Sequence, residues 1–221
     1  MQVEQPRSAA VRTLLAVEEE LANSVTHGVG LALSLLGLYS MLVLAINQGT
    51  AWHIVGFSIY GSSLVLLYAA STLYHSARCP RWKGALRIVD HVCIFLLIAG
   101  TYTPFTLTRL RGPWGWMLFA LVWSAAIAGI AFKIRSPRRF QSVSALPYIC
   151  MGWLAVLAIK PCLELIPPNE LVWLVAGGLC YTVGTVFYHA DRVPYFHAIW
   201  HLFVLAGSAC HYWAVTSCVA A

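Results

Sequence analysis

Two histidines four residues apart, His197 and His201, open the last apolar segment of this 221-residue chain. Residues at i and i+4 of an α-helix share a face and lie about 6 Å apart along the axis, so both imidazoles can reach one metal ion. A third histidine from another helix would complete a set with an open fourth position, which is typical of a catalytic zinc site. No glutamate follows His197, so the pair is not the HExxH motif of metalloproteases, and any base must come from another helix.

Other polar residues repeat the helical spacing. Ser71 and His75 form a second i, i+4 pair, and Glu20, Asn23 and His27 fall on one helical face. His27 also has a plain interpretation, as a capping residue or a partner of Glu20. The spacing alone leaves its role open.

The elements that position these residues are membrane helices. Of all residues 60% are hydrophobic and 10% are charged, whereas a soluble domain has roughly 25% charged residues. Crossing the hydrocarbon takes about 20 apolar residues. The apolar runs are continuous and do not alternate as barrel strands do. We therefore predict an all-α integral membrane protein with seven transmembrane helices: Val25–Ile46, Trp52–Tyr74, Ile88–Thr108, Trp114–Phe132, Val143–Ile159, Leu171–His189 and Ala198–Ala220.

Lysine and arginine predict the orientation. With the N-terminus in the cytoplasm and the C-terminus external, only Arg109, Arg111 and Lys160 of the 14 basic residues lie outside, as the positive-inside rule requires. The net charge of +6 then reflects topology and anionic headgroups and indicates no nucleic-acid partner. Residues 1–24 lack the apolar core of a signal peptide. We expect a cytoplasmic N-terminal segment, 1–24, followed by a seven-helix transmembrane domain, 25–221.

This topology brings ionisable side chains to one depth. Each lies at the cytoplasmic end of its predicted helix, and together they come from five helices: His27, His75, Asp90, His189, His197 and His201. Ionisable groups within the membrane are costly and mark functional sites by default. We therefore predict a metal site in the cytoplasmic leaflet, with Asp90 as proton acceptor or as partner of a ligand. A carboxylate paired with Arg87 is the plain alternative for Asp90.

A short internal repeat leaves the third ligand open. Residues 71–76 (STLYHS) resemble residues 185–190 (TVFYHA), and Asp90 precedes an Ala-Gly-Thr sequence by the distance at which His197 precedes Ala-Gly-Ser. The repeat makes His189 the counterpart of His75, so His189 is a rival ligand. The seven cysteines form no CxxC pair and are interpreted as small apolar residues. Cys162 and Cys218 are the one pair proposed as a bridge, and nothing requires it.

Together these motifs resemble the progestin and adipoQ receptor (PAQR) superfamily, and most closely its bacterial hemolysin III branch. The residues that carry the resemblance extend from Glu20 to the final helix: Glu20, Asn23, His27, Ser71, His75, Asp90, His197 and His201. The resemblance implies a seven-helix protein of the bacterial inner membrane. It also implies a zinc ion held by His75, His197 and His201, with Ser71 and Asp90 beside it as catalytic residues.

The resemblance also suggests a function. Related receptors and alkaline ceramidases indicate hydrolysis of a lipid amide or ester, whose lipid substrate would enter laterally, in membrane homeostasis. Two alternatives stay open. One is a regulator or receptor-like protein of the membrane in which zinc is structural. The other is a hemolysin-type pore-former. Charged residues do not line the helices through their outer half, which argues against a continuous ion path. No partner other than membrane lipids is implied, and the oligomeric state is not specified.

The predicted orientation has a direct test. We expect residues 76–87 and 133–142 in the cytoplasm and the C-terminus outside, because eleven basic residues then lie inside. A reporter fused after Ala221 should be active only if it functions outside the cytoplasm. Activity of a cytoplasm-specific reporter at that position would reverse the topology.

Overall fold

A computed structural model describes residues 6–136, 145–190 and 192–219. Of residues 6–13 it describes the backbone alone. All regular secondary structure of the described residues is helical, and seven segments are long and apolar enough to span a membrane. The predicted fold class is confirmed. The helices are α1 (Pro6–Gln48), α2 (Ala51–Ser76), α3 (Pro80–Leu107), α4 (Pro113–Arg135), α6 (Leu146–Gly152), the 3₁₀ helix η1 (Leu154–Ala158), α7 (Ile159–Leu165), α8 (Pro168–His189) and α9 (Phe196–Ser217).

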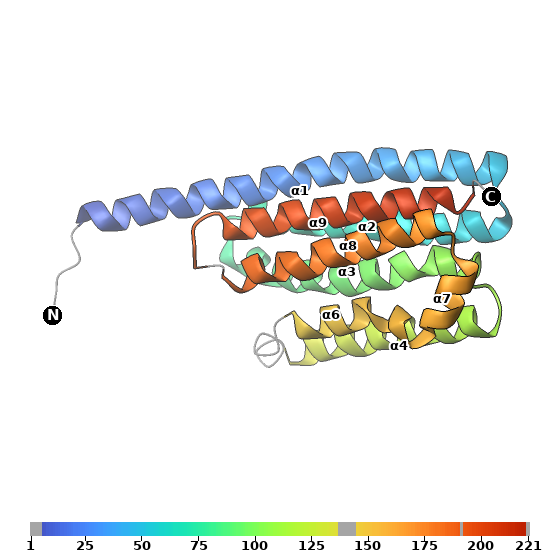
Figure 1. The fold of residues 1–221 in the computed structure, drawn as a ribbon. Helices are drawn as coiled ribbons and strands as arrows, with labels where there is room; N and C mark the ends of the chain where they lie inside the picture. The colour runs from blue at the N-terminus through green and yellow to red at the C-terminus, as the bar shows by residue number, and fades with distance from the viewer. Residues whose placement is uncertain (1–5, 137–144, 191, 220–221) are drawn as a thin grey trace.

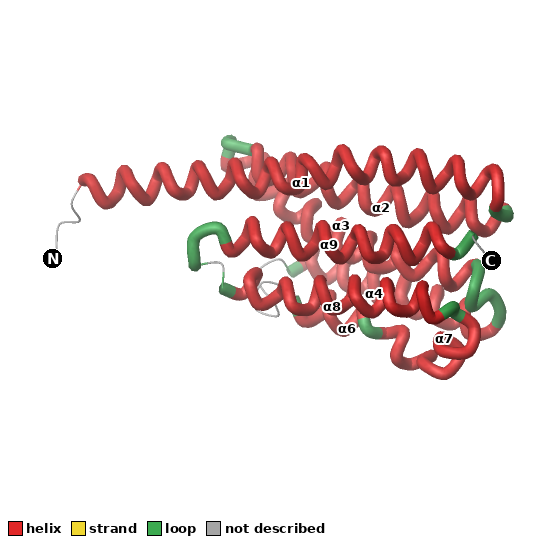
Figure 2. Tube along the Cα trace, turned by 45° about the horizontal axis from the view of Figure 1, so that its top comes forward, coloured by secondary structure: helices red, strands yellow, loops and turns green. Residues whose placement is uncertain are grey.

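The helices form one elongated bundle (Figures 1 and 2). α2 packs between α1 and α3, α4 lies against α3, and α9 packs on both α8 and α1. The α2–α3 and α8–α9 connections lie at the end of the bundle from which the N-terminus projects, and the chain ends at the opposite one (Figure 1). We call these the N-terminal end and the C-terminal end. The predicted topology therefore holds in relative terms: the ionisable helix ends lie at the N-terminal end.

α1 is longer than a membrane span. Its 43 residues extend about 64 Å at 1.5 Å per residue, against a hydrocarbon core of about 30 Å. The helix starts at Pro6, not near Val25, and continues through the predicted boundary at residue 24, projecting from the bundle (Figure 2). Ala, Leu and Glu, which dominate this stretch, are strong helix formers, so the helix propagates beyond the part that hydropathy detects.

The fifth span is broken into α6, η1 and α7. The Tyr102 hydroxyl of α3 donates to the Gly152 carbonyl at 2.6 Å and accepts from the Ala155 amide at 3.0 Å, which satisfies backbone groups that the break releases. A break within the apolar layer is tolerated where protein groups replace the lost bonds. The predicted fifth span, Val143–Ile159, is present as the apolar segment Leu146–Leu165, but it is not one continuous α-helix. Positions 143–144, like residues 137–142 and 220, lie outside the described residues.

A glycine allows the close approach of α2 and α3. A Cβ at Gly56 would stand 2.9 Å from Cα of Pro104. This proline lies inside α3, and no residue larger than glycine fits opposite its backbone without a shift. Small residues at helix contacts are the usual means of tight packing in membranes.

A buried ion pair fastens the C-terminal end. Arg109, between α3 and α4, donates from Nη2 to Glu170 Oε1 at 2.6 Å and from Nε at 3.2 Å. Its Nη2 also reaches the Ser217 carbonyl, while the Cys218 thiol donates to the same carboxylate at 3.5 Å. The side chain of Glu170 is 1% exposed. The hydrogen bond to Glu170 raises the pKa of Arg109, so the guanidinium group of Arg109 stays protonated. All seven cysteines are free thiols, and the Cys162–Cys218 bridge is not formed.

We predict that this ion pair contributes strongly to stability. Arg109→Met should lower the free energy of unfolding by about 3 kcal/mol, because it leaves an unpaired carboxylate in a buried position. Thermal or denaturant unfolding of the protein in detergent measures the loss. Lys160→Met is the matched control, since the Lys160–Glu164 pair is 3.9 Å long with both side chains mostly exposed and such pairs contribute little. Equal effects of the two substitutions would refute a special role for Arg109.

Candidate metal centre

Three histidines converge at the N-terminal end of the bundle. His75 lies in the last turn of α2, and His197 and His201 lie in the first two turns of α9. One ring nitrogen from each can be chosen so that all three lie within 4.8 Å of one another. The ring centroids are 4.7 to 5.1 Å apart. This spacing is close enough for one ion to contact all three side chains.

A carboxylate fixes the orientation of His75. Its Nδ1 lies 2.8 Å from Glu20 Oε2 of α1, while Glu20 Oε1 accepts from Lys83 Nζ at 2.7 Å. A carboxylate oxygen only accepts here, so Nδ1 carries the proton and Nε2 has a free lone pair. Metal-ligating histidines commonly have such a carboxylate partner, which sets the tautomer and the ring orientation.

Backbone groups fix His201 in the same tautomer. Its Nδ1 lies 3.2 Å from the Asn23 carbonyl and 3.1 Å from Thr26 Oγ1. The Asn23 carbonyl only accepts, and the single hydrogen of the Thr26 hydroxyl is shared between the carbonyls of Ala22 and Asn23, so both oxygens accept from His201. Nδ1 is therefore the protonated nitrogen, and Nε2 is the atom suited to bind a metal.

Buried polar atoms without a hydrogen-bond partner support the presence of a ligand site beside the three histidines. Among the described residues, His75 Nε2, His27 Nε2 and Asn23 Oδ1 are buried without a hydrogen-bond partner. Each such atom costs about 1–3 kcal/mol. A cation coordinated at His75 Nε2 would remove one of these penalties. The donor set of three neutral imidazoles also suits a transition metal such as zinc. The residues present therefore fit a metal ion.

Ser71 lies beside the histidine group, one helical turn before His75. Its Oγ is 2.6 Å from His27 Nδ1, and Asp90 of α3 interacts with both Ser71 and His75. His27 in turn stacks on His201, with ring centroids 3.5 Å apart. The arrangement brings a hydroxyl and a carboxylate next to the candidate ligands. His27 contacts the hydroxyl of Ser71 and the ring of His201.

His189 does not join the group. It is exposed, and its Nδ1 bonds the Thr185 carbonyl one turn earlier in α8 at 2.7 Å. The internal repeat suggested this residue as a rival to His75, but its position at the end of α8 leaves it outside the cluster of nitrogens that could share an ion.

His91 is a residue that the sequence analysis overlooked. Its Nδ1 lies 2.8 Å from Nζ of Lys133 in α4, whose side chain is almost fully buried. The Tyr148 hydroxyl donates to the His91 carbonyl at 3.1 Å. An imidazole that accepts from an ammonium is in the opposite tautomer to His75, which sets it apart from the ligand set. Its position directly after Asp90 was the available signal.

Comparison with known proteins identifies the family of the chain. Residues 15–212 match the family model described as haemolysin-III related. The chain is 50% identical to Hemolysin-3 of Bacillus cereus over 199 residues, which cover 90% of this chain and 91% of that protein. It is 46% identical to the Hemolysin-3 homolog of Bacillus subtilis over 202 residues, 91% of this chain and 95% of the relative.

A more distant relative is human. Monocyte to macrophage differentiation factor of Homo sapiens, a PAQR-type protein, is 30% identical over 206 residues, which cover 89% of this chain and 83% of the human one. The resemblance drawn from the motifs is thereby confirmed. With seven apolar helices and bacterial homologues, the chain is a multi-pass protein of the cell membrane, and it belongs to the haemolysin-III-related family.

Proposed function

We propose that the protein is an intramembrane zinc hydrolase acting on a lipid amide or ester in membrane homeostasis. The observation that carries this proposal is the buried, unpartnered Nε2 of His75 within the three-histidine group, with Ser71 and Asp90 beside it. When bound, zinc would lower the pKa of water towards about 7 and polarise the substrate carbonyl.

The roles of the surrounding residues follow from their contacts. Asp90 is the proton acceptor, because it is the carboxylate that interacts with both Ser71 and His75, whereas Glu20 is bound by His75 and Lys83. The Ser71 hydroxyl, held at 2.6 Å by His27, orients the attacking water or donates to the oxyanion that develops on the substrate carbonyl. Glu20 keeps His75 in the tautomer that binds metal.

Substrate access fits a lipid. The site lies at the N-terminal end of the bundle, the outer faces of its helices are apolar, and His197 is only partly buried. An acyl chain would lie against these faces while its amide or ester group reaches the histidines. With the predicted orientation, entry would be lateral and from the cytoplasmic leaflet.

Two other functions are distinguished by experiment. In a membrane regulator with structural zinc, the ion would tie α2 to α9 and no product would form. A pore-former would conduct ions in sealed vesicles. Purified protein incubated with a panel of lipid amides and esters decides for the hydrolase if product forms and a zinc chelator stops it. The proposal is contradicted if zinc-loaded protein releases no product from the panel. It is also contradicted if the only activity found is ion flux across the vesicle membrane.

We predict one zinc per chain. His197→Ala with His201→Ala should abolish binding, since α9 would then offer no ligand, and His75→Ala should lower occupancy severely. Metal analysis of the purified variants measures this. His189→Ala is the control and should retain the ion, because His189 lies outside the group. Loss of zinc from His189→Ala but not from His75→Ala would refute the ligand set.

Asp90→Asn tests the proton acceptor. The amide keeps the shape of the side chain but does not take up the proton, so we expect zinc to be retained and hydrolysis to fall by about 10²- to 10⁴-fold. Product formation and metal content are measured on the same preparation. An Asp90→Asn protein with both zinc and full activity would show that another group is the base.

A further inference from the structure

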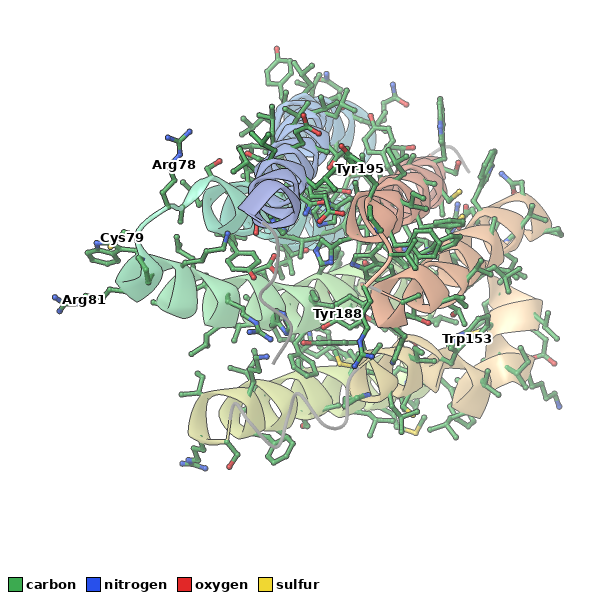
Figure 3. The ribbon with its side chains drawn as sticks, turned by 90° about the vertical axis from the view of Figure 1, so that its left-hand side faces the viewer. Arg78, Cys79, Arg81, Trp153, Tyr188 and Tyr195 are labelled. Carbon is green, nitrogen blue, oxygen red and sulfur yellow. The ribbon has the colours of Figure 1, made fainter. Side chains whose placement is uncertain are left out.

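Three consecutive glutamates of α1 each contact a part of the chain next to the candidate metal centre. Glu20 binds His75 and Lys83, as described above. Glu19 Oε1 accepts from the backbone amide of Tyr195 at 2.6 Å. Glu18 Oε2 accepts from the Tyr195 hydroxyl at 3.2 Å. Tyr195 stands at the start of α9, on the side facing α1 (Figure 3). The run of acidic residues therefore connects α1 to both helices that supply the histidines.

Tyr195 has an unusual backbone. Its φ of 64° and ψ of 0° lie in the left-handed region, and it is the only non-glycine residue of the described chain with positive φ. A bulky aromatic residue is rarely found there, because its Cβ crowds the neighbouring carbonyl. Such a conformation persists only where its surroundings hold it. The contact with Glu19 is the one hydrogen bond to the Tyr195 amide that the described residues provide.

This residue determines how α9 begins. Tyr195 is the N-cap, Phe196 is the first helical residue, and His197 follows directly. A change in the dihedral angles at Tyr195 would redirect the chain just before His197. The imidazole of His197 would then move relative to those of His75 and His201, from which it is now 5.1 and 4.7 Å away.

We propose that Glu19 is a positioning residue for the candidate metal centre: by binding the Tyr195 amide it holds the left-handed turn that places His197 beside His75 and His201. This inference rests on the proposed zinc site. The α1 segment that projects from the bundle is thereby connected to the ligand geometry. Glu18 is different, because it contacts only the phenol of Tyr195 and does not hold the backbone.

Zinc affinity of the full-length protein in detergent tests the proposal, with a chromophoric chelator as competitor. Glu19→Ala should raise the Kd for zinc about three- to tenfold, the effect expected for loss of one hydrogen bond of ordinary strength at an exposed position. Glu19→Gln should restore near wild-type affinity, because its amide oxygen still accepts from the Tyr195 amide. Glu18→Ala and Tyr195→Phe, which remove only the phenol contact, should stay within about twofold.

A glycine at position 195 provides the sharpest control, since glycine adopts positive φ without strain. In the Tyr195→Gly background, Glu19→Ala should change the Kd by less than about twofold. If Glu19→Ala alone does not fold, glycine at 195 must restore both folding and zinc binding. Thermal unfolding without zinc separates a general loss of stability from a change in ligand geometry.

The outcomes separate this inference from the zinc site itself. A wild-type protein that binds no zinc refutes the proposed centre. A wild-type protein that binds zinc, with Glu19→Ala binding equally tightly, refutes the role of Glu19 alone. If Glu19→Ala has the same effect on the Kd in the wild-type and in the Tyr195→Gly background, the carboxylate does not act through the left-handed turn. This result would also overturn the inference.

Discussion

The need to satisfy imidazole nitrogens in apolar surroundings governs the N-terminal end of the bundle. A buried polar atom without a partner costs free energy that a membrane protein recovers only through internal contacts. One nitrogen of each of three rings is bound by the protein itself: His75 by Glu20, His201 by the Asn23 carbonyl and His27 by Ser71. These contacts set the tautomers of His75 and His201, and through them the nitrogens left for a ligand. They also join α1, α2 and α9, so the same bonds that orient the ligands align the helices.

Much of this arrangement follows from sequence periodicity. Apolar length gives the seven spans, and the i, i+4 spacing places His197 and His201 on one face, while topology brings His75 to the same end. What periodicity does not contain is contact between distant segments. The Glu19–Tyr195 bond joins residues 176 positions apart, and no glycine or asparagine marks the left-handed turn. The break in the fifth span depends on the Tyr102 hydroxyl from another helix. His91 was missed because Asp90 alone was taken as the polar residue of that turn.

The extension of α1 changes how its acidic residues are understood. In the sequence, Glu20 alone of the three consecutive glutamates was assigned to a motif, the one that it forms with Asn23 and His27. In the structure the helix carries them along the ends of α2 and α9, while Leu14, Val17 and Leu21 of the same stretch are exposed. The Glu18 contact raises the pKa of the Tyr195 hydroxyl, so this phenol stays protonated and remains a donor.

The two ends of the bundle differ in how completely their described polar groups are paired, and this difference indicates the end at which a metal ion would bind. At the C-terminal end the buried carboxylate of Glu170 accepts from Arg109 and from the Cys218 thiol. At the N-terminal end, by contrast, His75 Nε2, His27 Nε2 and Asn23 Oδ1 are buried without partners among the described residues. The one other such atom, His211 Nδ1, belongs to no cluster that could share a metal. At about 1–3 kcal/mol each, three unpaired atoms within one group of side chains are costly unless a bound ion or substrate completes them.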